Sequence, residues 1–245
     1  MIVAVLGEKG GTGKTTLATN LAGMRAAARA GRQVLLVDAD RQGSASYWAE
    51  QRRTTARPAV TCLQKFGRAL ARDLRALAPR YDDVIIDVAA GDSPDLEAVL
   101  RVAARVLMPV QPAGLDVWTL GLLEDRVAEA QAVNPALTAF VVLNRASPNP
   151  RDRDTHDAQQ AIAACAHLRI APVVIRERVA IKRATPAGLS VQEYTPRDAK
   201  ATAELAQVYQ LAFAEKRASH GHSTRQPRPA RGHSGQRPQR PASAQ

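Results

Sequence analysis

Hydrophobic residues in this chain gather in short continuous runs instead of alternating with polar ones. Six runs rich in β-branched residues lie at 2–6, 34–38, 84–87, 105–110, 138–144 and 172–175. A strand that is apolar on both sides is typical of a parallel sheet with both faces covered. The runs therefore predict the strands of a parallel sheet.

Longer segments with helical spacing of apolar residues separate these runs. Such segments include residues 15–30, 94–104, 116–133 and 155–167, and a last helix is expected from about residue 197 to 217. The last one places Leu205, Val208, Leu211 and Ala212 on one face. Strands alternating with helices at this pace predict an α/β fold, a doubly wound and mostly parallel sheet with helices on both faces.

The composition changes abruptly near the C-terminus. Residues 218–245 contain five arginines, no acidic residue and no large apolar residue. Such a segment has nothing to offset the entropy lost on ordering. We therefore predict one domain at residues 1–217, large enough to bury a core, and a disordered basic tail at 218–245.

The formal net charge of +11 favours a polyanionic partner, either nucleic acid or an anionic membrane. The apolar run at 2–6 is too short for a signal peptide, and no run approaches the length of a membrane span. Cys62 and Cys165 have no metal-type spacing and are expected to be reduced. We expect a cytoplasmic protein.

The stretch GEKGGTGKTT at residues 7–16 carries the clearest chemistry. A glycine-rich turn between a strand and a helix exposes backbone N–H groups that can cradle phosphate, and glycine allows the close approach. Lys14 would then reach the β- and γ-phosphates of ATP, and the Thr15 hydroxyl would bind Mg²⁺. The expected nucleotide contacts in this loop are Gly10, Gly11, Thr12, Gly13, Lys14, Thr15 and Thr16.

The usual phosphate-loop spacing fails here, because its first glycine falls on Glu8. The pattern K-G-G-x-G-K-T instead resembles the deviant Walker A motif of the ParA/MinD family of P-loop ATPases. Residues 34–48 resemble the switch segment of that family, with Arg41 in place of its usual proline. Residues 81–94 resemble the Walker B strand, which ends at Asp87.

This resemblance implies a role for each matching residue. Asp38 and Asp87 would join Thr15 around Mg²⁺, and Asp40 would orient the attacking water. The amide of Asn144 would meet the adenine edge. Lys9 would cross a two-fold interface to the phosphates of a second copy, so that two ATP molecules lie inside a homodimer. The catalytic residues implied are Lys9, Lys14 and Asp40.

The short partition ATPases of this family resemble the chain over residues 1 to about 215. The resemblance implies ATP-dependent, non-specific DNA binding on the nucleoid, segregation of plasmid or chromosomal DNA, and a ParB-like partner that stimulates hydrolysis. Basic residues that could neutralise DNA phosphates are Arg151, Arg153, Arg176, Arg178, Lys182 and Arg183.

Other outputs of the same ATPase stay open. The runner-up positions a protein cargo, such as a microcompartment, on the nucleoid. A third possibility is a nucleotide-gated DNA coat with negligible turnover. A MinD-like membrane ATPase is less favoured, because residues 218–245 lack the bulky apolar residues of an amphipathic membrane helix. We therefore expect no membrane partner.

Overall fold

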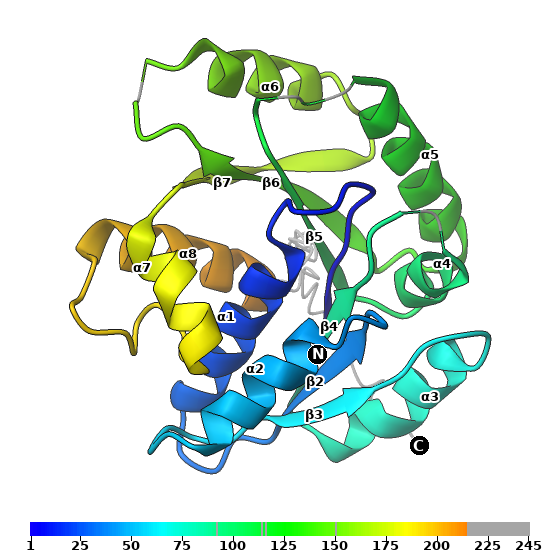
Figure 1. Cartoon of the computed structure of the whole chain (residues 1–245). Helices are drawn as coiled ribbons and strands as arrows, with labels where there is room; N and C mark the ends of the chain where they lie inside the picture. Colours follow the sequence, from blue (N-terminus) through cyan, green and yellow to red (C-terminus); the bar gives the residue numbers. More distant parts are fainter. Residues whose placement is uncertain (92, 114, 116, 150, 215–245) are drawn as a thin grey trace, which may run out of the picture. The chain divides into compact units, whose positions relative to one another are not determined.

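The computed structural model describes residues 1–214 apart from residues 92, 114, 116 and 150. The predicted tail at 218–245 lies outside these residues. Seven strands form one sheet in the order β3-β2-β4-β1-β5-β6-β7, and every pairing is parallel (Figure 1). The strands are β1 (Ile2–Val5), β2 (Val34–Ala39), β3 (Thr61–Gln64), β4 (Asp83–Val88), β5 (Arg105–Val110), β6 (Thr138–Ala146) and β7 (Leu168–Arg176).

Helices cover both faces of the sheet, so the expected fold class is confirmed (Figure 1). They are α1 (Lys14–Ala27), α2 (Ser44–Arg53), α3 (Leu70–Leu77), α4 (Pro94–Leu100), α5 (Val117–Val133), α6 (Arg153–Ala163), α7 (Val179–Ala184) and α8 (Ala199–Phe213). Two single 3₁₀ turns, Ala78–Arg80 and Thr185–Ala187, follow α3 and α7.

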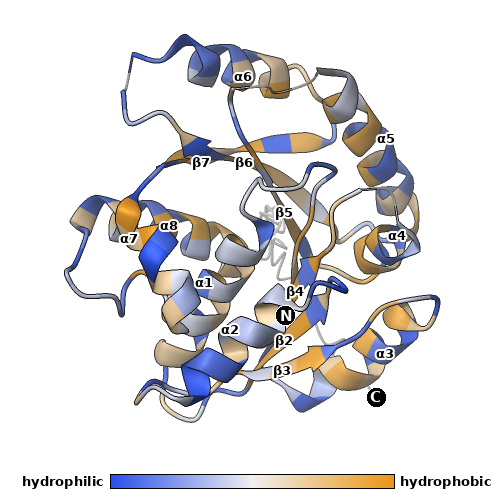
Figure 2. Ribbon diagram, in the orientation of Figure 1, coloured by the Kyte–Doolittle hydropathy of each residue, from blue (hydrophilic) through white to orange (hydrophobic). Residues whose placement is uncertain are grey.

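Each face of the sheet has its own hydrophobic core. Helices α1, α2, α7 and α8 contribute to one core, and α3, α4, α5 and α6 to the other. Successive residues of β1 and the residue that follows it serve both cores: Val3 and Val5 belong to the first, Ala4 and Leu6 to the second. The central strands β1, β2, β4 and β5 are accordingly mostly apolar, whereas the helices carry polar outer faces (Figure 2).

The sequence pattern missed one strand and placed several boundaries differently. Strand β3 is short and its residues are exposed or half-buried, so it shows no apolar run. Helix α4 ends at Leu100, four residues before the expected end, and β7 begins at Leu168, four residues before the expected start. Helix α8 ends at Phe213, and residues 215–217 of the expected helix lie outside the described part of the chain.

The strand order places β1 at the centre of the sheet, between β4 and β5. The chain builds one half of the sheet from β2, β3 and β4 and then crosses β1 to build the other half. Ligands of open α/β sheets bind at the carboxyl ends of the strands, where the winding reverses. The glycine-rich loop at residues 7–13 follows β1 at that point.

Candidate functional site

The glycine-rich loop has the conformation that a phosphate cradle needs. Gly11 and Gly13 have positive φ angles of 74° and 95°, and Gly13 is the N-cap of α1 without a side-chain cap. A Cβ atom at Gly13 would collide with the amide nitrogen of Asn144. Glycine is therefore required at this position by both conformation and space. The first N–H groups of α1 face the loop without helical partners, as an anion site requires.

Lys14 lies inside this cradle. Its side chain is buried, and its Nζ donates to the backbone carbonyl of Lys9 at 2.9 Å. Burial lowers the pKa of Lys14, while the nearby carboxylates of Asp87 and Asp40 oppose that effect. The result is a desolvated cation close to two carboxylates, at the loop where a triphosphate and its metal would bind.

Asp38 and Asp87 stand on neighbouring strands at the same level, because β2 and β4 pair with Asp38 opposite Asp87. Asp38 is satisfied by protein groups: its Oδ2 accepts from the Ser46 amide at 2.8 Å and the Ser46 hydroxyl at 2.7 Å. Both oxygens of Asp87 are buried without a hydrogen-bond partner. Burial raises the pKa of Asp87 to about 7, and the Asp38 and Asp40 charges add to this effect, while the Thr15 hydroxyl and the Lys14 charge oppose it.

A divalent cation fits this set of groups. No three His, Cys, Asp or Glu side chains of the described residues gather into a metal site of their own. Mg²⁺ characteristically uses one or two carboxylates, water and substrate phosphates instead. The orphaned Asp87 carboxylate, with Thr15 at the start of α1, supplies such a partial set.

Asp40 follows β2 in a tight turn that leads into α2. Its Oδ1 accepts from the Gln42 amide at 2.9 Å, and Gly43 enters α2 with a φ of 69°. Asp40 lines the same cavity as the glycine-rich loop. Arg41, which replaces the family proline, lies over the ring of Phe66 at 4.5 Å from its centroid.

Asn144 and Arg145 at the end of β6 both reach the glycine-rich loop. Asn144 Nδ2 donates to the Thr12 carbonyl at 2.7 Å, and Arg145 donates to the Gly11 carbonyl at 2.8 Å. The sequence analysis assigned Asn144 to adenine, which stays a prediction, and it missed Arg145. Ser46 was also missed, because a serine in a short helix carries no signal by itself.

A cavity of about 500 Å³ opens beside the loop, within the size range of a small-molecule site. Its walls come from the loop, from Asp40, from the end of β6 and from the segment between β7 and the second 3₁₀ turn. Side chains that line it include Lys14, Thr15, Thr16, Asn144 and Ile181.

The structure divides the six predicted DNA contacts into two groups. Arg176, Arg178 and Lys182 line the nucleotide-sized cavity, and each interacts with a protein acceptor. Arg151, Arg153 and Arg183 are exposed outside it. The DNA assignment stays a prediction for all six.

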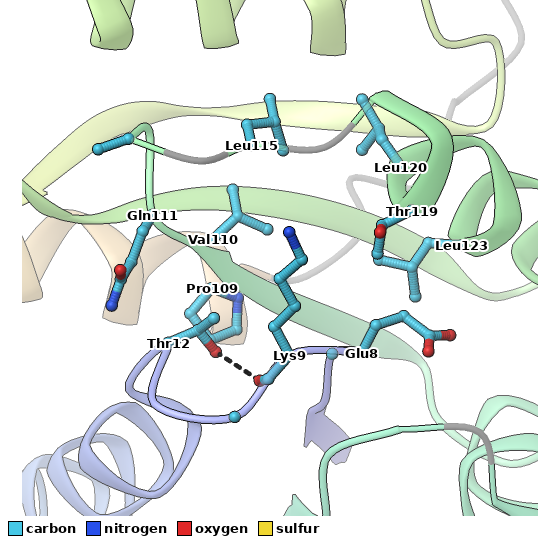
Figure 3. Close-up of a pocket in the computed structure, with 13 residues that line it drawn as sticks. Glu8, Lys9, Thr12, Pro109, Val110, Gln111, Leu115, Thr119, Leu120 and Leu123 are labelled. Carbon is cyan, nitrogen blue, oxygen red and sulfur yellow. Dashed lines mark hydrogen bonds between the residues drawn. The ribbon is translucent and has the colours of Figure 1, made fainter.

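Lys9 points away from its own phosphate cradle. Figure 3 shows its side chain rising from the loop between Val110 and Glu8, with the ammonium directed toward the β5–α5 connection. It lines a second cavity of about 90 Å³ with Leu115, Leu120 and other apolar side chains. The role of Lys9 at the phosphates of a second copy stays a prediction.

Comparisons with known proteins agree with this geometry. The model of the family described as "CobQ/CobB/MinD/ParA nucleotide binding domain" matches residues 3–191. A "maintenance of carboxysome distribution protein A" from Gloeobacter kilaueensis is 39% identical over 203 residues, which cover 81% of this chain and 87% of that protein. The protein of the same description from Halothiobacillus neapolitanus is 30% identical over 208 residues, which cover 84% of this chain and 93% of that protein.

Solved structures show the same fold. The apo form of a Cyanothece McdA superposes with a TM-score of 0.69 at 20% identity, covering 85% of this chain and 98% of that one. A plasmid partition protein from Borrelia burgdorferi bound to AMPPNP gives a TM-score of 0.64 at 18% identity and covers 86% and 97%. ATP and Mg²⁺, expected from the sequence, also occur in solved relatives.

The two relatives, at 39% and 30% identity, favour the cargo-positioning alternative over the leading expectation of plasmid or chromosome segregation. None of the helices in the described residues is long and apolar enough to cross a membrane. The family model matches most of the chain, and the residues of the phosphate loop, the switch segment and the Walker B strand lie together at one edge of the sheet. The chain therefore belongs to the CobQ/CobB/MinD/ParA family and is a ParA/MinD-type P-loop ATPase.

Proposed function

We propose that this protein is a Mg²⁺-dependent ATPase that dimerises with ATP and positions a protein cargo, such as a carboxysome-like body, on the nucleoid. The observation that carries the proposal is the similarity to two carboxysome distribution proteins along most of their length. The plasmid partition likeness is below 25% identity and supports the fold alone.

The residues of the site suggest how ATP would be held. The loop amides and Lys14 would bind the phosphates, and Asp87, Thr15 and Asp38 would hold the metal. When bound, Mg²⁺ neutralises charge on the phosphate oxygens. Asp40, which lines the same cavity, would orient a water for attack on the γ-phosphate.

Dimerisation would complete the site. The Lys9 side chain points away from the loop that would hold the phosphates of ATP in the same copy (Figure 3). In a face-to-face pair it would add a positive charge to the γ-phosphate of the other copy, as an arginine finger does. ATP would then act as the link between two copies, and hydrolysis would separate them.

Binding to the nucleoid would rest on charge. The net charge of +11 and the exposed Arg151, Arg153 and Arg183 supply cations for sequence-independent DNA binding. A cargo-borne partner would stimulate hydrolysis and release the dimer, in the place that ParB-like proteins take in partition systems. Such DNA binding should weaken steeply as salt concentration rises.

The test follows two cargoes in the same cells. In the native host, the gene is deleted and restored as wild type or as Lys9→Ala, with a fluorescent shell protein and a tagged replication origin as markers. We expect shell bodies to cluster in the deletion and in the Lys9→Ala strain, while origins separate normally. Scattered shell bodies with lost origins or plasmids would instead support DNA segregation and contradict the proposal.

A further inference from the structure

Arg145 has an unusual backbone conformation. Among the described residues it is the one non-glycine residue with a positive φ, which is 54°. This region is unfavourable for a residue with a Cβ atom, and such strain persists where the surrounding structure enforces it. Strained residues of this kind concentrate at binding and catalytic sites.

The strain lies at an irregularity between β6 and β7. The pairing runs Leu143 to Val174 and then Ala146 to Arg176, so three steps along β6 match two along β7. Successive side chains of a regular strand point to opposite faces of the sheet. A bulge changes this alternation and re-aims a side chain.

Because of the bulge, two consecutive side chains serve the same loop. Asn144 donates to the Thr12 carbonyl and Arg145 to the Gly11 carbonyl, at 2.7 and 2.8 Å. Gly11 is one of the two loop glycines with positive φ. Its carbonyl also accepts from Gln111 at 3.1 Å. The peptide at the tip of the phosphate loop is therefore held from the ends of both β5 and β6.

A carboxylate orients the Arg145 guanidinium. Glu177 follows β7, and its amide donates to the Ala146 carbonyl at 2.9 Å, directly beside the bulge. Its Oε1 lies 3.5 Å from the Arg145 guanidinium and 2.5 Å from Lys182 Nζ. Arg145 and Lys182 thus share one oxygen, which links the loop to the basic segment that contains α7.

We propose that Arg145 is a positioning residue that holds the phosphate loop in its ATP-binding conformation, with Glu177 fixing the direction of its guanidinium. The inference rests on the proposed function only for the identity of the ligand, ATP. Arg145 acts through the Gly11 peptide, so its loss should weaken nucleotide binding more than it slows turnover.

The test separates this role from general stability by replacing Arg145 with glycine. Arg145→Gly removes the guanidinium but also relieves the positive-φ strain, and the exposed ion pair to Glu177 contributes little to folding. We expect an unfolding midpoint no lower than wild type, together with about tenfold weaker binding of a fluorescent ATP analogue with Mg²⁺. Arg145→Lys should restore part of the affinity, and Glu177→Gln should lose part of it.

The control is Arg80→Ala, which removes an exposed arginine near the opposite ends of the strands. It should bind the analogue as wild type does. Wild-type affinity in Arg145→Gly would overturn the inference and leave the proposed function intact. A fall in stability that accounts for all of the lost binding would also overturn it. Failure of wild type itself to bind the analogue would contradict the proposed function instead.

Discussion

Replacing Asp87 by asparagine tests the metal site, because an ionised carboxylate at this position should lower the stability of the protein when no metal is bound. Asp87 is 1% exposed and both of its carboxylate oxygens lack hydrogen-bond partners. Burial raises its pKa from 3.8 to about 7, against the opposing effects of the Thr15 hydroxyl and the Lys14 charge, and the Asp38 and Asp40 charges contribute less to the rise. Without a cation, the ionised carboxylate should therefore destabilise the fold, and Asp87→Asn should relieve this cost.

The size of the effect follows from the two pKa values. Between them, the folded protein binds a proton that the unfolded chain has lost, so stability falls as pH rises. The contribution is fully present below pH 3.8 and is lost by about pH 7. A rise in pKa from 3.8 to about 7 corresponds to about 4 kcal/mol of unfolding free energy. Roughly 3 kcal/mol of this falls between pH 5 and pH 8.5.

The assay is urea unfolding of wild type and Asp87→Asn in EDTA at pH 5 and pH 8.5. The stability of the variant relative to wild type should rise by roughly 3 kcal/mol between the two pH values, because other titrating groups cancel in the comparison. Mg²⁺ with ATP should then stabilise wild type far more than the variant. An equal difference at both pH values would refute the assignment of Asp87 as an uncompensated buried carboxylate.

Two further substitutions test the phosphate loop and the packing of α2. Gly13→Ala forces a Cβ against Asn144 at a φ of 95°, and should cost at least about 1–2 kcal/mol and abolish binding of an ATP analogue; tight binding in titration calorimetry would contradict the steric reasoning. Arg52→Ala leaves Glu193 buried without its bidentate partner at 2.8 and 2.9 Å, and should cost about 3–5 kcal/mol in urea unfolding. The exposed neighbour Arg53 is the matched control, and equal losses for both alanine variants would argue against a buried ion pair.

Much of the nucleotide side of the site could be predicted from the sequence, because its determinants are local. The apolar runs ending at Asp38 and Asp87 identify two strands, and parallel strands bring their carboxyl ends to one edge. The glycines at 11 and 13 indicate positive φ angles, which the structure confirms. The sequence predicts the structure well at positions where the conformation depends on the residue itself and its near neighbours in the chain.

Features that depend on pairing between distant segments could not be predicted. Strand β3 is a half-exposed edge strand, so it lacks the apolar run that marks its neighbours. Helix α2 starts after Gly43 without a side-chain cap, and its start signal is correspondingly weak. The role of Arg145 depends on a bulge set by the β6–β7 register, which no local pattern in the sequence reveals.

The central claim is that ATP joins two copies, each contributing Lys9 to the nucleotide of the other. Sedimentation at saturating non-hydrolysable ATP analogue and Mg²⁺ tests it most directly, with Lys9→Ala beside wild type. We expect a wild-type species of twice the 26.3 kDa monomer mass, and a variant that binds the analogue but stays monomeric. A wild-type monomer under these conditions, or a Lys9→Ala dimer as stable as wild type, would contradict it.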